Sequence, residues 1–481
     1  MGMDESLDRW VCEEFDSLDL GHGARNKRAR LMLDRMVRHP AGTLAQTFAH
    51  PAEREGAYRF VESKSFSWTL LAEASHQACA RRCALLDEVL VVLDGSSYRH
   101  SDSAHDDGGG PIGSHRNGAR GLKIMAAIAM TMAGVPLGVA AHHLWARAEQ
   151  PVGDHVRRAL ADKESRHWVE LQRRFEQGLT DIEARCRVSY VMDAEADALH
   201  VLLRAMDGVR LTVRMHYDRN LAALDTADAQ HPELKALAAL ASSEALGHLW
   251  VMLPRRGHQR PRLVCLTLYT QRVSVRLRAQ WSKRKVGDVP LHVVMAREES
   301  ASWAHEPIEW VLWTSESIDT FEAVARVVRI YALRFRIEGV FFASKTGLCE
   351  TERAQFETFE ALARWITLKL SVAVRAKALL EASRHEPDVP ADRDFAREEI
   401  DGALLLHQRE CGGKTAVGTT PTLGQMVTLI AQLGGYTGKS SGGPPGIVTF
   451  SRGMEKVQVA TMVLSALRSN TPSPTRCDGS D

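Results

Sequence analysis

Two apolar runs that each end in an aspartate constrain this chain more than any other feature. The run EVLVVLD ends at Asp94, and the run RVSYVMD ends at Asp193. Both have the length and the β-branched content of buried strands. A carboxylate directly after a buried strand is costly unless it is paired or binds a metal. Asp94 alone is best explained as a helix cap, but two such acids on separate strands favour a shared metal site.

The segments around these runs alternate between helical and strand-like patterns from residue 69 onward. This alternation predicts a mixed α/β domain. Residues 124–146 carry no charge and are long enough to be tested as a membrane span. However, the middle of this stretch has a sequence typical of a turn, Gly134-Val135-Pro136. We therefore expect a buried β-hairpin and no membrane span.

The length of 481 residues corresponds to roughly three domains. The patterns predict helices over residues 1–68, the α/β domain over 69–381, and a helical domain with a disordered tail over 382–481. The net charge of +1 means that any signal for nucleic acid must be local. The N-terminus lacks the basic and apolar blocks of a signal peptide, which predicts a cytoplasmic protein.

Two segments are locally basic. Residues 254–287 carry ten basic residues and no acidic residue, on strand-like sequence, which indicates contact with phosphate. The other segment lies on a predicted helix near the N-terminus. There, a solvated face and contact with the DNA backbone explain the pattern equally well. The candidate contacts in this helix are Arg25, Lys27, Arg28 and Arg30.

A third acidic candidate lies on a long helix predicted over residues 320–342. At about 100° per residue, four polar side chains fall within an arc of roughly 60° on this helix and its continuation. They are Tyr331, Arg334, Glu338 and Lys345. A surface ion pair between Arg334 and Glu338 would give the same spacing.

Taken together, these motifs resemble the insertion-sequence-four family of bacterial DDE transposases. The resemblance covers nearly the whole chain, in the order of the family. The matching elements are YRF at residues 58–60, LDGSSYRH around Asp94, YVMDAEAD around Asp193, the signature Y-x2-R-x3-E-x6-K from Tyr331 to Lys345, KTG at Lys345 and SVAVR at residues 371–375. The Gly-rich loop after Asp94, and Phe450 where relatives often have Trp, depart from the family pattern.

The resemblance implies a ribonuclease H-like catalytic domain with a β-strand insertion at about residues 205–315, flanked by helical N-terminal and C-terminal domains. Asp94, Asp193 and Glu338 would be the catalytic acids and would bind two Mg²⁺ ions per active site, for which Mn²⁺ can substitute. Three carboxylates suffice, because Mg²⁺ keeps several waters and takes phosphate oxygens as further ligands. The first 68 residues would bind DNA ends, and the C-terminal domain would dimerise.

Other residues receive a DNA-binding role from the same resemblance. Trp310 matches an aromatic residue that stacks on a flipped base, although a large aromatic on a strand is otherwise most often part of the core. The remaining predicted DNA contacts are Tyr58, Arg59, Tyr331, Arg334 and Lys345.

The resemblance implies a cut-and-paste transposase that nicks transposon ends, forms and resolves end hairpins, and transfers 3′-hydroxyl ends to target DNA. The expected partners are double-stranded DNA and a second copy of the chain in a synaptic homodimer, with no membrane and no organic cofactor. We also expect association with the bacterial nucleoid. The alternative is an inactive transposition inhibitor or a domesticated DNA-binding protein, which would be expected to lose a catalytic acid or the N-terminal domain.

Overall fold

The computed structural model describes ten segments of the chain. They are residues 8–100, 109–112, 119–148, 163–222, 234–253, 261–278, 285–299, 306–412, 416–439 and 443–469. Most of the Gly-rich loop after Asp94 and the predicted disordered tail lie outside these described residues.

The first part of the described chain is helical, as predicted. Its helices are α1 (Arg9–Glu14), α2 (Gly23–Arg38), α3 (Leu44–Thr47) and α4 (Pro51–Val61). The amphipathic pattern of α2 buries Met32, Leu33 and Met36, and these side chains pack with Val11 and Phe15 from the segment before it.

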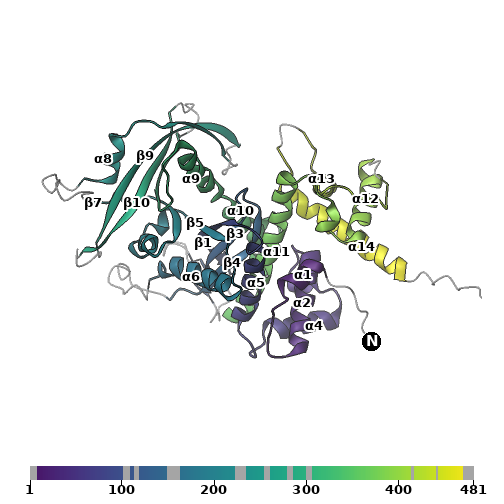
Figure 1. The fold of residues 1–481 in the computed structure, drawn as a ribbon. Coiled ribbons are helices and arrows are strands. Elements are labelled where there is room, and N and C mark those ends of the chain that lie inside the picture. The colour runs from purple at the N-terminus through teal and green to yellow at the C-terminus, as the bar shows by residue number, and fades with distance from the viewer. Residues whose placement is uncertain are drawn as a thin grey trace, which may run out of the picture.

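A mixed sheet forms the centre of the molecule (Figure 1). The predicted hairpin at residues 124–146 is confirmed, because its two strands, β3 and β4, pair antiparallel on either side of the turn at Gly134. Five strands in the spatial order β4-β3-β1-β5-β6 make this part of the sheet, with β1 antiparallel to β3 and parallel to β5. Their bounds are β1 (Glu88–Arg99), β3 (Arg120–Met130), β4 (Pro136–Trp145), β5 (Arg187–Met192) and β6 (Arg210–Arg214), and the short β2 (Gly110–Pro111) pairs with β3.

The predicted insertion continues the same sheet beyond β6 instead of forming a separate sheet. β11 pairs antiparallel with β6, β10 pairs with β11, and β9 pairs with β10. Within the basic segment predicted to be strand-like, residues 262–278 form one long strand. The bounds here are β7 (Leu221–Ala222), α8 (Ala236–Ala241), β8 (Gly247–Leu253), β9 (Arg262–Arg278), β10 (Lys285–Glu298) and β11 (Glu309–Thr314).

Alternating side chains divide the sheet into two apolar faces. On β1, Leu90 and Val92 belong to the larger core, whereas Val89 and Val91 belong to the smaller one. Helix α6 (Arg166–Asp181) covers the smaller core, next to the short α7 (Leu199–Leu202). The larger core is covered by α9 (Phe321–Leu333), α10 (Arg336–Phe342) and α11 (Phe359–His385), together with the first part of α5 (Trp68–Cys83).

The single helix predicted over residues 320–342 is interrupted. α9 ends at Leu333, α10 begins at Arg336, and a π-helical turn over Ala343–Gly347 follows α10. The apolar periodicity continues across the break, which is why the sequence pattern predicted one helix. The break falls at Arg334 and Phe335, inside the predicted signature.

Helix α11 lies between the sheet and the helices of both chain ends (Figure 1). Three of its cations contact the N-terminal segment: Arg364 donates to the carbonyl oxygens of Val61 and Phe66, Lys369 donates to those of Pro40 and Gly42, and Arg375 pairs with Asp8. Burial lowers the pKa of Lys369 to about 8.

The predicted boundary at residue 381 lies within α11. The helices beyond it are α12 (Arg397–Cys411), α13 (Leu423–Leu433) and α14 (Ile447–Ser469). Among the helices of the described segments, none is long and apolar enough to cross a membrane.

Candidate active site

The parallel pairing of β1 with β5 brings the two strand-associated acids to neighbouring positions. The last paired residues are Val92 and Val191, so Asp94 and Asp193 each lie two residues beyond the same point of the register. In contrast to the sequence expectation, β1 does not end at Asp94, because it continues to Arg99 along β3, with Asp94 opposite Ala126. Asp193 does follow the last residue of β5, and its carboxylate accepts a hydrogen bond from the Glu195 backbone N–H at 2.9 Å.

The pKa of the Asp94 carboxyl is raised to about 7. Burial is the largest cause, and the nearby carboxylates of Asp193 and Glu338 raise the pKa further. The Arg334 guanidinium and a hydrogen bond from the Gly95 backbone N–H to Asp94 Oδ1, at 2.8 Å, act in the opposite direction. The other two predicted acids, Asp193 and Glu338, are therefore close enough to affect the ionisation of Asp94.

Arg334 joins two of these acids. Its Nη1 donates to Asp94 Oδ2 at 3.1 Å, and its Nη2 donates to Glu338 Oε1 at 3.0 Å. The Arg334 side chain is buried, whereas that of Glu338 is 53% exposed. Burial lowers the pKa of Arg334, but Tyr331 and the surrounding carboxylates more than offset this, so its pKa is raised. The ion pair that was the alternative explanation of the helical spacing is therefore present, but Arg334 is buried in it and also pairs with the acid on β1.

Tyr331 and Trp310 lie in the larger core beside this ion pair. Their rings pack edge to face with centroids 5.2 Å apart, and Phe335 contacts both. Trp310 thus has the core position that is usual for a large aromatic on a strand. The buried Tyr331 hydroxyl has no hydrogen-bond partner within the described part of the chain, and burial raises its pKa.

Lys345 approaches the site from the π-helical turn. Its Nζ donates to Ser96 Oγ and lies over the ring of Tyr98, 5.6 Å from the centroid. Burial lowers the pKa of Lys345, while Asp94 is among the groups that raise it. The Tyr98 hydroxyl lies 2.7 Å from Ser344 Oγ, which ties the turn to β1. Ser96 was not predicted, although the period of two along a strand places it on the same face as Asp94.

The donor set fits a hard divalent cation. Carboxylate oxygens are the ligands that Mg²⁺ prefers. A divalent cation would also reduce the repulsion between the neighbouring carboxylates. In the arrangement described here, Arg334 lies between Asp94 and Glu338. Across the described segments, no three His, Cys, Asp or Glu side chains are gathered closely enough to form a metal cluster. Asp94, Asp193 and Glu338 are the residues that could hold the ion.

The four basic candidates on α2 differ in their surroundings. Arg25 donates to the Leu20 carbonyl oxygen at 3.2 Å, and Arg30 donates to that of Phe15 at 2.7 Å. The Arg28 guanidinium packs against Gly56, where a Cβ atom would lie 2.8 Å from it. Lys27 is exposed.

The two predicted contacts on α4 also lie at the surface. Tyr58 is 39% exposed, and Arg59 forms an exposed ion pair with Glu55. Their positions leave both side chains accessible, which a DNA contact requires.

Residues 7–66 match the family described as Transposase DNA-binding. The match covers α1 to α4, including all six of the N-terminal candidates. It supports a transposase that binds DNA and therefore a DNA-processing enzyme.

Proposed function

We propose that this chain is a cut-and-paste transposase of the insertion-sequence-four family. It binds transposon ends, nicks them, forms and resolves end hairpins, and transfers the 3′-hydroxyl ends to target DNA. The observation that carries the proposal is that Arg334 pairs with both Asp94 and Glu338 and that the Asp193 carboxylate is near enough to raise the pKa of Asp94, in a chain that also matches a transposase DNA-binding family.

The order of the central strands supports a ribonuclease H-like catalytic domain. Three antiparallel strands, β4-β3-β1, are followed by β5 and β6 parallel to β1. Asp94 lies on β1, Asp193 directly follows the parallel strand β5, and Glu338 lies on helix α10, which packs on the sheet. The insertion separates β6 from this helix, in the position that the family resemblance implies.

Asp94, Asp193 and Glu338 would hold two Mg²⁺ ions, for which Mn²⁺ can substitute. When bound, the ions stabilise the charge that develops on the entering and leaving oxygens of an in-line displacement at phosphorus. The protein supplies no nucleophile, because the attacking group is water in the first nick and a 3′-hydroxyl in hairpin formation and strand transfer.

The neighbouring side chains are suited to hold DNA at this site. The planar Arg334 guanidinium can grip a phosphate with two hydrogen bonds, and Lys345 can act as a point charge beside it. The Tyr331 hydroxyl is a donor without a partner in the described segments. Trp310 would hold an unstacked base, which requires its ring to leave the contact with Tyr331.

The C-terminal domain is suited to contact a second copy of the chain. The outer side of α14 exposes apolar side chains at helical spacing, so that they form one stripe. They are Val459, Met462, Val463 and Leu467, which are 55%, 46%, 54% and 62% exposed. Such a stripe favours a homodimer in the complex with two DNA ends and target DNA. Association with the nucleoid would follow from the binding of DNA by the N-terminal helices.

The proposal is tested with duplexes that carry the inverted repeats flanking the gene. Asp94→Ala, Asp193→Ala and Glu338→Ala should each abolish nicking of the duplex in Mg²⁺ or Mn²⁺, while a gel shift still detects end binding. Ca²⁺ should not support nicking, because it prefers more ligands and a looser geometry.

The exposed acid Glu357 provides a matched control, since Glu357→Ala should nick at the wild-type rate. Cleavage retained in any of the three variants would refute the assignment of the acids. End binding without cleavage by the wild-type chain would instead favour the inhibitor or the domesticated DNA-binding protein.

A further inference from the structure

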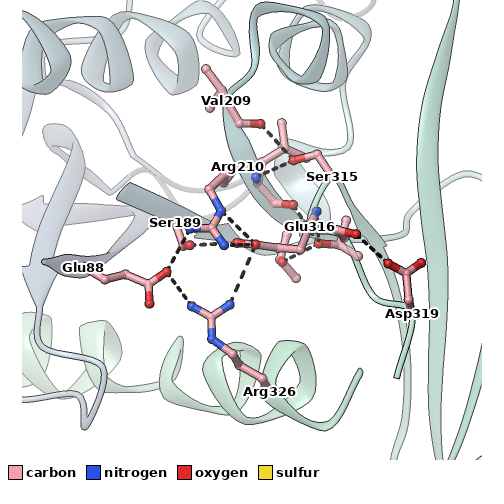
Figure 2. A network of polar contacts seen from close by, with 12 residues as sticks. Glu88, Ser189, Val209, Arg210, Ser315, Glu316, Asp319 and Arg326 are labelled. Atoms are coloured by element: carbon pink, nitrogen blue, oxygen red, sulfur yellow. Dashed lines mark hydrogen bonds and ion pairs between the residues drawn. The ribbon is translucent and has the colours of Figure 1, made fainter. Parts of the chain in front are cut away.

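A network of charged side chains (Figure 2) lies where β1 and β6 begin, whereas Asp94 lies farther along β1 and Asp193 follows the end of β5. The Glu316 carboxylate is buried and accepts from Ser189 Oγ at 2.8 Å and from Arg210 Nε at 2.9 Å. Arg326 Nη1 lies 3.8 Å from the same carboxylate. Glu88 closes the network, because its Oε1 accepts from Arg210 at 3.0 Å and from Arg326 at 2.6 Å.

Three members of the network lie on β1, β5 and α9, the elements that carry Asp94 or end next to Asp193 and Arg334. Glu88 is the first residue of β1, six residues before Asp94, which corresponds to about 20 Å of strand. Ser189 on β5 precedes Asp193 by four residues, or about 13 Å of strand. Both spacings are even, so each pair of residues shares one face of the sheet.

The third element is α9, which carries Arg326 near its middle and Arg334 immediately after its end. Helix α9 and strand β1 are thus joined twice, by Arg326 with Glu88 at one end and by Arg334 with Asp94 at the other. Apolar side chains of both elements fill the space between these ion pairs, including Val92 of β1.

The remaining two members fix the strands that connect the catalytic elements to the insertion. Arg210 begins β6, and Glu316 follows β11 on the way to α9. The antiparallel register of these strands, in which Thr212 lies opposite Thr314, brings Arg210 opposite Glu316 when it is continued by two residues. The network therefore links four strands and one helix through two guanidinium groups and two carboxylates.

We infer that Glu316, with Arg210, Arg326 and Glu88, is a positioning unit for the catalytic acids. It holds β1, β5 and α9 in the relative placement that pairs Arg334 with Asp94 and brings Asp193 to the neighbouring position. The inference rests on the proposed function, since it concerns the metal site that those acids would form. The residues of the network do not touch the reacting atoms.

The test compares Glu316→Gln with a matched control in the full-length chain. Glu298 is the control, because it is a similarly buried carboxylate paired with an arginine, Arg262, on the insertion strands away from the acids. For each chain we would measure Mn²⁺ binding by electron paramagnetic resonance, the metal concentration for half-maximal nicking, end binding and thermal unfolding.

Glu316→Gln should weaken Mn²⁺ binding and raise the metal midpoint of nicking, each by about 2- to 30-fold, the range found for networks that couple distant sites. End binding should stay at the wild-type value. Glu298→Gln should change thermal unfolding by a similar amount and leave both metal readouts unchanged. Glu316→Asp keeps the charge and should recover part of the affinity.

A loss of thermal stability with unchanged Mn²⁺ binding in Glu316→Gln would overturn the inference and leave the network a purely structural role. Arg326→Gln repeats the test at a partly exposed position if Glu316→Gln fails to fold. Asp94→Ala distinguishes a failure of the proposed metal site from a failure of the positioning role of Glu316. If the wild type binds Mn²⁺ and Asp94→Ala does not, the metal site stands whatever Glu316→Gln shows; if the wild type binds no Mn²⁺, the proposed function and the inference both fail.

Discussion

The Arg334 guanidinium lies 3.1 Å from the Asp94 carboxylate, at the break between α9 and α10. The same guanidinium holds Glu338 at 3.0 Å. The break in the helix is therefore located where one side chain connects the acid on the strand to the acid on the helix. The positions of both carboxylates depend on this planar group.

Replacing Arg334 with Lys should lower the rate of nicking by about 10- to 100-fold, the usual cost of losing a group that orients metal ligands. A lysine keeps the charge, but its compact ammonium cannot present the same fork to two carboxylates. The rate is measured with an end-labelled duplex under single-turnover conditions. Arg329→Lys is the control, because Arg329 is on the same helix but is exposed and pairs only loosely with Glu322. Equal rates for both variants would contradict the orienting role.

Lys27 and Arg30 on α2 should respond differently to substitution by Ala. Lys27 is exposed, so its loss should weaken end binding and reduce the salt slope by about one unit without changing stability. Arg30 is bonded to the Phe15 carbonyl oxygen, so its loss should lower the free energy of unfolding by about 1.5–3 kcal/mol. Salt titrations of end binding and urea unfolding separate the two effects. An unchanged salt slope in Lys27→Ala would identify Lys27 as solvated surface.

Trp310 can be tested against a second tryptophan of β11. Trp310 and Trp313 are both buried, in the larger and the smaller core respectively. Replacing either with Ala should lower the free energy of unfolding by about 3–5 kcal/mol, and replacing either with Phe should cost less. Only Trp310→Phe and Trp310→Ala should slow hairpin formation after a normal first nick, as resolved on a denaturing gel. Hairpins formed at the wild-type rate would leave Trp310 a core residue.

The buried pair His76 and His142 predicts a loss of stability in acid. Their Nε2 and Nδ1 atoms lie 3.0 Å apart, and His142 Nε2 donates to Thr367 Oγ1, since the Thr367 hydroxyl itself donates to the Ala363 carbonyl oxygen. This arrangement holds both rings neutral. Burial lowers the pKa of His142 to about 3 and that of His76 well below its usual value.

The unfolded chain binds protons at these histidines near pH 6.5, whereas the folded chain does not until a much lower pH. These histidines therefore do not reduce the free energy of unfolding above about pH 6.5. As the pH decreases below this value, the free energy of unfolding falls by up to about 1.4 kcal/mol per pH unit for each histidine. Urea unfolding at pH 7.5, 6.5 and 5.5 gives the slope. His142→Gln should reduce the slope, and the exposed His248→Gln should not. Identical slopes in His142→Gln and the wild type would exclude this origin.

The sequence was sufficient to predict the elements whose signals are local. The hairpin of β3 and β4 follows from an uncharged apolar stretch interrupted by turn residues, and the placement of Asp193 follows from the length of one buried run. The pairing of Arg334 with Glu338 follows from helical spacing. In each case the information lies within a few residues of the chain.

Other features depend on contacts between distant segments. The continuation of β1 past Asp94 is fixed by its pairing with β3, and the break at Arg334 occurs where the helix meets Asp94. The network around Glu316 joins residues from four strands and α9, so no local pattern indicates it. The hydrogen bond from Arg30 to the Phe15 carbonyl oxygen joins residues 15 positions apart, so the basic pattern of the helix did not indicate it, and the DNA contact of Arg30 stays a prediction.

The attachment of the first helices to α11 has a consequence for where DNA would be cut. Arg364 and Lys369 donate hydrogen bonds to backbone carbonyl oxygens of the N-terminal segment, and a carbonyl oxygen remains when the side chain of its residue is changed. Under the proposed function, the contact between the N-terminal helices and α11 would then set the number of base pairs between the bound repeat and the scissile phosphate. A chain that recognises a new repeat would cut at the same spacing from it, and a shifted cut would require a change in α11.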